Sequence, residues 1–171
     1  MSTTDDEAGF NAFVSGRFAA LARTAYLLTG NHHDAEDLVQ TALAKAARAW
    51  PRIRHRPEPY VRRILYNENI SQWRKRRVSE HSTSEPNGRL PGHEGATDDL
   101  ATKITLQRAL AKLTPKQRTV LVLRYYEDLT EKQAAAAMGV SVGTIKSQTR
   151  HALMRLRQLA PDLVELVEAG H

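Results

Sequence analysis

Apolar residues recur about every 3.6 positions along three stretches in the first half of the chain, which is the spacing of amphipathic helices. The first stretch runs from Phe10 to Leu28, and the second runs from Leu38 to Trp50. The third begins near Pro59, because proline is favoured in the first turn of a helix. Its expected core face consists of Val61, Ile64, Leu65 and Trp73. No stretch of useful length alternates with a period of two, so the pattern predicts helices and argues against strands.

Local signals predict where the first two helices meet and where the second one ends. Gly30 and Asn31 separate the first stretch from the second. Three acids precede the second stretch, in a first turn where the helix dipole favours negative charge: Asp34, Glu36 and Asp37. Pro51 is expected to end this helix, because proline lacks the backbone donor that a helix interior needs.

The second half of the chain carries sharper helix signals. Thr114–Gln117 and Thr130–Gln133 each have the pattern of a capping box, in which Thr and Gln side chains bond each other's backbone N–H groups. The helix of the second box should end at Gly139. The next helix should begin after Ser141 and stop before Pro161, which leaves room for one short helix at the end of the chain.

The segment between the two halves has a different composition. Residues 79–98 are rich in Pro, Gly, Ser, Thr and acids, and their apolar periodicity stops. Such a segment cannot bury enough apolar surface to order itself. We therefore expect a flexible acidic linker over residues 79–100. It joins two small helical domains, residues 1–78 and residues 101–171, in an all-α protein.

Residues 131–150 meet the demands of a helix-turn-helix, whose second helix enters the major groove of DNA. Ala135 supplies the small residue where the two helices cross. Gly139 supplies the positive φ of the turn, and Ile145 supplies the anchor in the core. An ordinary helical hairpin with a polar outer face is the alternative.

The outward face of the second helix carries side chains that can bond base edges or phosphates: Thr144, Lys146, Ser147, Gln148, Arg150 and His151. At its start, Ser141 and Gly143 lie where free N–H groups attract a phosphate. Met138 and Val140 are expected on the buried side of the turn. Together with the local basic charge, these residues favour DNA binding over the plain hairpin.

The net charge of +6 is unevenly distributed along the chain. Residues 51–78 carry nine Lys or Arg against two acids, and residues 101–171 carry eleven against six. Residues 79–100 carry one against five. Two basic blocks around an acidic segment are typical of a protein that binds a polyanion at two places.

The first basic block also contains Tyr60, Tyr66 and Trp73. Single-stranded nucleic acid is held by this mixture, since cations follow the backbone while aromatic rings stack on bases. The loop Arg52–Pro57 suits a rim that binds phosphates or bases. The alternative is that the aromatic rings belong to the core and the cations form a solvated face.

Other protein classes have little support. The chain has no Cys, so disulfides and thiolate metal sites are excluded, and a reducing, cytoplasmic compartment fits. No apolar run is long enough to span a membrane, and the acidic N-terminus is unlike a secretory signal. His32 and His33 beside Asp34 could suggest a metal site, but adjacent side chains on a helix point in different directions. No metalloprotease, P-loop or hydrolase motif is found, so we expect no enzyme activity, no cofactor and no metal.

The runs DAEDLVQTALAKAARAW (34–50) and PYVRRILYNENISQWRKRR (59–77) resemble the second conserved region of bacterial sigma factors. Residues 113–157 resemble the fourth region, and the pair with a short linker resembles the extracytoplasmic-function group. The resemblance implies a factor that directs promoter recognition, promoter melting and transcription initiation. Its implied partners are core RNA polymerase (β′ clamp helices and β flap), duplex promoter DNA and the melted non-template strand. An anti-sigma factor is a further candidate partner, and a membrane is not.

The resemblance also implies three sets of site residues. The polymerase set, on the second helix, is Asp34, Glu36, Asp37, Leu38, Gln40 and Thr41. The minus-ten set, in the Arg-rich loop and the third helix, is Arg52, Arg54, His55, Arg56, Tyr60, Asn67, Trp73, Arg74, Arg76 and Arg77. The minus-thirty-five set is Ser141, Gly143, Thr144, Lys146, Ser147, Gln148, Arg150 and His151. The alternative function is a stand-alone helix-turn-helix regulator, which would need neither the acidic second helix nor the Arg-rich block.

Overall fold

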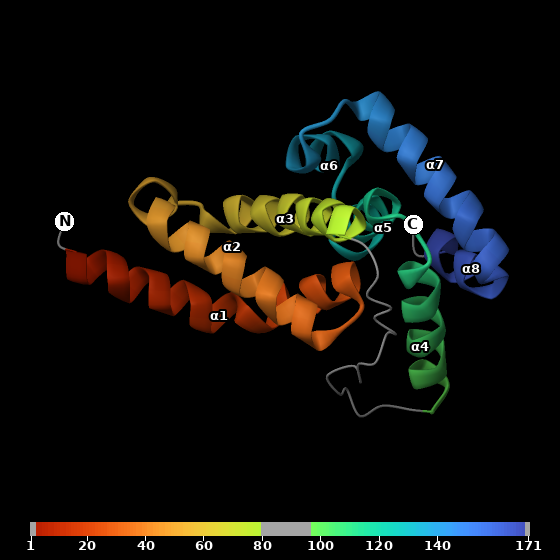
Figure 1. Ribbon diagram of the computed structural model, residues 1–171, viewed down its shortest axis with the longest axis horizontal. Coiled ribbons are helices and arrows are strands. Elements are labelled where there is room, and N and C mark those ends of the chain that lie inside the picture. Colours follow the sequence, from red (N-terminus) through yellow and green to blue (C-terminus); the bar gives the residue numbers. More distant parts are fainter. Residues whose placement is uncertain (1–2, 80–96, 170–171) are drawn as a thin grey trace.

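The computed structural model describes residues 3–79 and 97–169, and within these ranges every regular element is a helix (Figure 1). The N-terminal lobe consists of α1 (Thr3–Thr29), α2 (His32–Ile53) and α3 (Pro57–Ser79). The C-terminal lobe consists of α4 (Thr97–Ala111), α5 (Pro115–Leu121), the π-helical segment η1 (Val122–Tyr126), α6 (Glu131–Met138), α7 (Val142–Leu159) and α8 (Pro161–Ala169). The predicted all-α fold with two helical parts is confirmed.

In the N-terminal lobe, α2 packs against both α1 and α3. Asn31 caps α2, because its side-chain oxygen accepts the Asp34 N–H at 2.8 Å. At the far end of α2, the Trp50 ring meets Phe10 edge-on with centroids 5.3 Å apart, and Phe13 packs beside it. The apolar face of α2 is therefore buried along its length, and its polar face remains at the surface.

One predicted helix end in this lobe is wrong. Pro51 does not end α2, which continues to Ile53, and the Arg54 N–H donates to the Trp50 carbonyl at 2.9 Å. A proline in the last turn removes one hydrogen bond but leaves no long helix beyond it to disturb. The third helix begins at Pro57, close to the expected start near Pro59, and both prolines lie in its first turn.

The aromatic residues of α3 divide between core and surface. Tyr66 is 1% exposed, and Val61 and Leu65 are fully buried, so this part of the predicted core is confirmed. Trp73 was expected on the same face, but it is 38% exposed. It lies near the end of α3, where it lines a groove against the C-terminal lobe. Tyr66 is thus a core residue and does not stack on nucleic acid in this arrangement.

Most of the predicted linker, residues 80–96, lies outside the described residues. At its far end, residues 97–100 belong to the first turn of α4, although their composition predicts a linker.

The helix caps of the C-terminal lobe follow the sequence closely. Both predicted capping boxes are present, with Thr114 paired to Gln117 and Thr130 paired to Gln133 through reciprocal bonds of 2.9–3.2 Å. Between them α5 continues into η1, whose wider turns carry the chain to the loop before α6. α6 and α7 then follow each other across a short connection (Figure 1).

The turn between α6 and α7 has the expected helix-turn-helix geometry. Gly139 ends α6 with φ +67°, a conformation that side chains with a Cβ rarely adopt. Ser141 caps α7 by accepting the Thr144 N–H at 3.1 Å. Ile145 is fully buried and Ala135 nearly so, which confirms their predicted places.

The two lobes lie against each other in what we call the closed arrangement. α3 contacts α5 and α6, and α1 contacts α4, α5 and η1 (Figure 1). One apolar cluster contains Leu65 and Tyr66 of α3 together with Val120, Leu123 and Ile145 of the C-terminal lobe. A second cluster lies mainly between α4, α5, α7 and α8. Within the described residues, no helix combines the length and apolarity that crossing a bilayer needs.

Candidate polymerase and nucleic-acid interfaces

The polymerase set lies on the first turns of α2 and splits between surface and core. Glu36, Asp37 and Gln40 are exposed, while Asp34 and Thr41 are half-buried. Leu38 is fully buried, so its predicted place in a binding surface is wrong: it faces inward and supports the helix. The exposed part of this set is an acidic and polar face.

The Asp34 carboxylate forms an ion pair with a residue of the minus-ten set. Both its carboxylate oxygens accept bonds from Arg76 of α3 at 2.7 Å each, and one also accepts the Asn31 side-chain N–H at 2.7 Å. Burial alone acts to raise the pKa of the Asp34 carboxyl. The bonds from Arg76 and Asn31 outweigh this effect, so the pKa is lowered and the charge is retained.

The minus-ten set forms a band from the end of α2 through the Arg-rich loop and along α3. Most of its members are exposed: Arg52, His55, Arg56, Asn67, Trp73, Arg74 and Arg76. Tyr60 is half-buried. Arg54 is half-buried too and pairs with Asp6 of α1 at 3.0 Å, so part of its charge is already balanced. The Arg77 side chain lies outside the described residues.

The minus-thirty-five set lies on the start and outer face of α7. All of its members except the half-buried Gln148 are exposed: Ser141, Gly143, Thr144, Lys146, Ser147, Arg150 and His151. The Ser141 and Thr144 hydroxyls bond each other at 3.0 Å, and Ser141 also caps the helix, so both have structural roles.

The turn before α7 corrects one expectation. Val140, predicted on the buried side of the turn, is 37% exposed. Its N–H closes the turn on the Ala135 carbonyl at 3.0 Å, and its side chain is left at the surface. Met138 is half-buried and packs against the core as predicted.

A groove of about 640 Å³ brings the two DNA-binding sets together. Trp73 and Arg74 of α3 line one side, and Gln148 and His151 of α7 line the other, with Lys116 of α5 between them. The sequence placed these residues in separate domains, and no local signal predicted that they share one groove.

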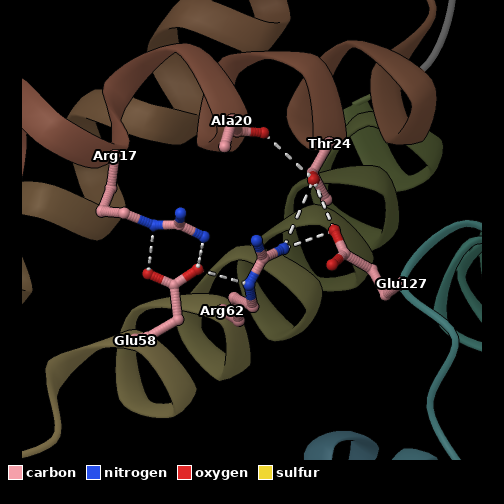
Figure 2. Close-up of polar contacts among 6 residues, drawn as sticks. All are labelled: Arg17, Ala20, Thr24, Glu58, Arg62 and Glu127. Atoms are coloured by element: carbon pink, nitrogen blue, oxygen red, sulfur yellow. Dashed lines mark hydrogen bonds and ion pairs between the residues drawn. The ribbon is translucent and has the colours of Figure 1, made fainter.

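A polar cluster joins the lobes at the start of α3 (Figure 2). Arg17 of α1 donates two bonds to Glu58 at 2.6 and 2.9 Å, and Arg62 of α3 donates to the same carboxylate at 2.8 Å. A second Arg62 nitrogen bonds Glu127 of the C-terminal lobe. Thr24 of α1 donates its hydroxyl to the same Glu127 oxygen at 2.6 Å.

The charged groups in this cluster shift one another's pKa values. Burial acts to lower the pKa of Arg62, but attraction to Glu127 outweighs it and the pKa is raised. Burial acts to raise the pKa of Glu58, but the bonds from Arg17 and Arg62 outweigh it and the pKa is lowered. Burial, followed by the charge of Glu127, raises the pKa of Tyr66 to about 12. Glu58 and Arg62 therefore keep their charges at neutral pH, and Tyr66 stays uncharged beside them.

Arg118 makes a second polar connection between the lobes. Its guanidinium donates to backbone carbonyls at the ends of two helices: to Leu110 and Leu113 near the end of α4, at 2.8 and 3.2 Å, and to Leu28 of α1. Burial lowers the pKa of Arg118 to about 10. Its positive charge lies where helix dipoles are negative, which favours this placement.

Comparison with known proteins identifies both lobes. A family model described as Sigma-70 region 2 matches residues 18–78, and one described as Sigma-70, region 4 matches residues 109–158. The RNA polymerase sigma-E factor of Streptomyces coelicolor is 39% identical over 153 residues, which cover 87% of this chain and 84% of that protein. ECF RNA polymerase sigma factor SigW of Bacillus subtilis is 29% identical and covers 81% of either chain.

Solved structures agree with the sequence relatives. The sigma factor RpoE from Bartonella quintana, in complex with the anti-sigma factor NepR, matches with a TM-score of 0.72 and 30% identity. The match covers 90% of this chain and 97% of that one, so it includes both lobes. The chain therefore belongs to the sigma-70 family of RNA polymerase sigma factors, in its extracytoplasmic-function group.

Proposed function

We propose that this sigma factor directs RNA polymerase to promoters through three separate surfaces. The acidic face of α2 binds the β′ clamp helices of core polymerase. The Arg-rich loop and α3 hold the melted non-template strand of the minus-ten element, and α7 reads the minus-thirty-five duplex. The protein acts in the cytoplasm, where polymerase and chromosome meet, and no chemical step is assigned to the chain itself.

The division of exposed cations between α3 and α7 carries this proposal. Arg74 and Arg76 lie on α3, and Lys146 and Arg150 lie on α7, so each lobe has its own site for a polyanion. Each lobe also matches a different sigma region. Two modest sites on one chain act together once polymerase sets their spacing, since the first contact raises the effective concentration for the second.

The two surfaces suit two forms of DNA. α7 is a capped helix with a polar outer face, the shape and chemistry that fit a major groove. The α3 surface instead exposes the Trp73 ring beside Arg74, and an aromatic face with cations suits unpaired bases. Extruding a base from the duplex costs a few kcal/mol, which contacts of this kind offset.

Run-off transcription with purified core polymerase tests the proposal. We expect start-site-defined transcripts from minus-ten and minus-thirty-five promoters only when polymerase and this protein are both present. Arg150→Ala should lower their yield roughly 5- to 150-fold, the range of one good base contact. On a template with a scrambled minus-thirty-five element, Arg150→Ala and the unchanged protein should give similar transcript yields. The contact between residue 150 and its base is already lost on that template.

Arg155→Ala is the matched control, since Arg155 is also exposed on α7 and donates to Gln158 of the same helix at 3.2 Å. It should leave transcription near the unchanged level. A stand-alone helix-turn-helix regulator would give the opposite pattern: tight, specific duplex binding without polymerase and no transcript with it. Family membership does not favour that alternative.

A further inference from the structure

We propose that Asp6, in the first turn of α1, is a positioning residue for recognition of the minus-ten element. It holds the Arg54 guanidinium within the Arg-rich loop and so keeps that cation away from the DNA phosphates. The inference rests on the proposed function, because it concerns the surface assigned to the melted minus-ten strand. It adds a residue that lies outside the match to Sigma-70 region 2, which begins at residue 18.

Aromatic packing brings the start of α1 to the Arg-rich loop. The Trp50 ring, four positions before Arg54, has its centroid 5.3 Å from that of Phe10 and 5.7 Å from that of Phe13. Gly9 also faces this ring, since a Cβ at that position would lie 3.6 Å from the nearest Trp50 atoms. The first turns of α1 therefore pack against the end of α2, and Figure 1 shows them at the same end of the N-terminal lobe as the loop.

An ion pair joins Arg54 to α1. Nη1 of Arg54 lies 3.0 Å from a carboxylate oxygen of Asp6, and the two side chains are 23% and 24% exposed. The neighbouring cations of the loop differ from Arg54, because Arg52, His55 and Arg56 are all exposed. Arg54 is therefore held against α1, whereas its three neighbours lie at the surface, where a DNA strand can reach them.

Asp6 offsets the cost of keeping Arg54 in this position. The Nε nitrogen of Arg54 is buried and meets no acceptor among the described residues. A buried donor without a partner costs free energy, and the cost is larger for a charged group. The bond from Nη1 to Asp6 opposes that cost, because it joins two opposite charges. Without the Asp6 carboxylate, the Arg54 side chain gains free energy by turning out to water or to a phosphate.

The position of Arg54 affects selectivity as well as affinity. A phosphate contact strengthens binding to every sequence, whereas contacts with bases distinguish one sequence from another. An extruded base is read by hydrogen bonds inside a shaped pocket. An Arg54 side chain that moves to a phosphate adds affinity for any strand and removes part of the rim of the loop. Asp6 thereby preserves the preference of the loop for the minus-ten sequence.

The salt dependence of strand binding tests the proposal. For single-stranded DNA, the logarithm of the binding constant falls with the logarithm of the salt concentration, by about 0.7 for each neutralised phosphate. Fluorescence anisotropy at several salt concentrations measures this slope for the complex of core polymerase with the protein. The probe is a labelled minus-ten strand from a promoter that run-off transcription identifies. In Asp6→Asn the slope should steepen by about 0.7, and the affinity at low salt should rise roughly twofold to fivefold.

Three further variants separate a positioning role from a general change in charge. Asp6→Asn combined with Arg54→Ala should return the slope to that of the unchanged protein, because the released cation is gone. Asp6→Glu keeps a carboxylate within reach of Arg54 and should keep the original slope. Asp5→Asn is the matched control: it removes an exposed acid from the same turn of α1, and its slope should stay unchanged. Circular dichroism should report the same helix content for every variant.

A scrambled strand of equal composition gives a second readout. The ratio of the affinities for the minus-ten strand and the scrambled strand should fall in Asp6→Asn and be kept in Asp5→Asn.

Equal slopes in Asp6→Asn and the unchanged protein would overturn the positioning role. So would an extra slope that persists in the double variant, or one that appears equally in Asp5→Asn. If the unchanged complex binds both strands alike, the proposed minus-ten surface is wrong, and this inference falls with it. Equal slopes with a retained preference for the minus-ten strand would overturn the positioning role alone.

Discussion

Arg76 places its two terminal nitrogens 2.7 Å from the two carboxylate oxygens of Asp34, which joins the end of α3 to the first turn of α2. Asp34 belongs to the polymerase set and Arg76 to the minus-ten set. Each charge therefore neutralises the other in the free protein. A polymerase cation that competes for Asp34 releases Arg76 for phosphate, so the two binding events should favour each other.

Asp34→Asn should release Arg76 and strengthen binding of the free protein to a single-stranded minus-ten oligonucleotide. Arg76 is half exposed, so the pair is worth little, and we expect a gain of roughly twofold to fivefold. Fluorescence anisotropy at low salt measures it. Asp37→Asn is the control for this readout: it makes the same change on α2, where Asp37 lies 3.6 Å from His33. Equal effects of the two variants would contradict a specific Asp34–Arg76 contact.

Glu58→Gln should destabilise the protein at neutral pH but not in acid. The folded pKa of Glu58 lies below its ordinary value of 4.5, because the bonds from Arg17 and Arg62 outweigh burial. Its stabilisation is therefore complete above pH 4.5 and disappears as the pH falls through the lowered pKa. Urea unfolding of both proteins at several pH values measures the difference in free energy. A difference in unfolding free energy that stays constant into acid would contradict the ion pairs as its cause. The control is Glu165→Gln at an exposed position, whose unfolding free energy should differ little from that of the unchanged protein at any pH.

Gly139→Ala should cost about 1–2 kcal/mol of unfolding free energy, because φ at this position is +67° and a Cβ is strained there even in open space. Gly16→Ala is the matched comparison. Gly16 lies within α1 at an ordinary helical φ with equally open surroundings, so alanine should stabilise the protein by about 0.5–1 kcal/mol. Denaturant unfolding of both variants should give opposite signs, and the same sign for both would contradict a role for φ.

The two tryptophans should respond differently to substitution. Trp73→Ala should weaken binding of the minus-ten strand by the polymerase complex roughly 5- to 150-fold, the value of one stacked base, and leave stability nearly unchanged. Trp50→Ala should cost about 3–5 kcal/mol of stability, because the ring is packed between Phe10 and Phe13. Thermal unfolding and oligonucleotide binding separate the two effects. Loss of stability without loss of binding in Trp73→Ala would assign that ring to the fold.

Local signals predicted the helices of the C-terminal lobe well. The Thr and Gln of each capping box, the left-handed Gly139 and the Ser141 cap all depend on residues within a few positions of one another. The end of the second helix was mispredicted at Pro51. One lost hydrogen bond in a last turn is too small an effect to stop a helix whose apolar face is already buried. Trp73 was placed in the core by periodicity, which cannot tell where neighbouring helices stop covering a face.

The contact between the lobes could not be predicted from the sequence. Thr24 and Glu127 are 103 positions apart, and neither is part of a capping, turn or helix-turn-helix signal. Glu58 and Arg62 follow each other at helical spacing and suggest at most a surface pair. Their partners come from α1 and from the loop before α6, so the cluster exists only once the tertiary fold is formed.

The apolar cluster that spans both lobes has a consequence for the lifetime of the factor. With Val120 and Leu123 packed beside Tyr66, the lobes should melt together, and calorimetry of the free protein should give one peak. A molecule whose lobes come apart loses this mutual support and exposes chain that proteases can cut. The packing between the lobes should therefore also protect the factor from turnover, and the pool of intact factor should shrink when substitutions weaken that packing.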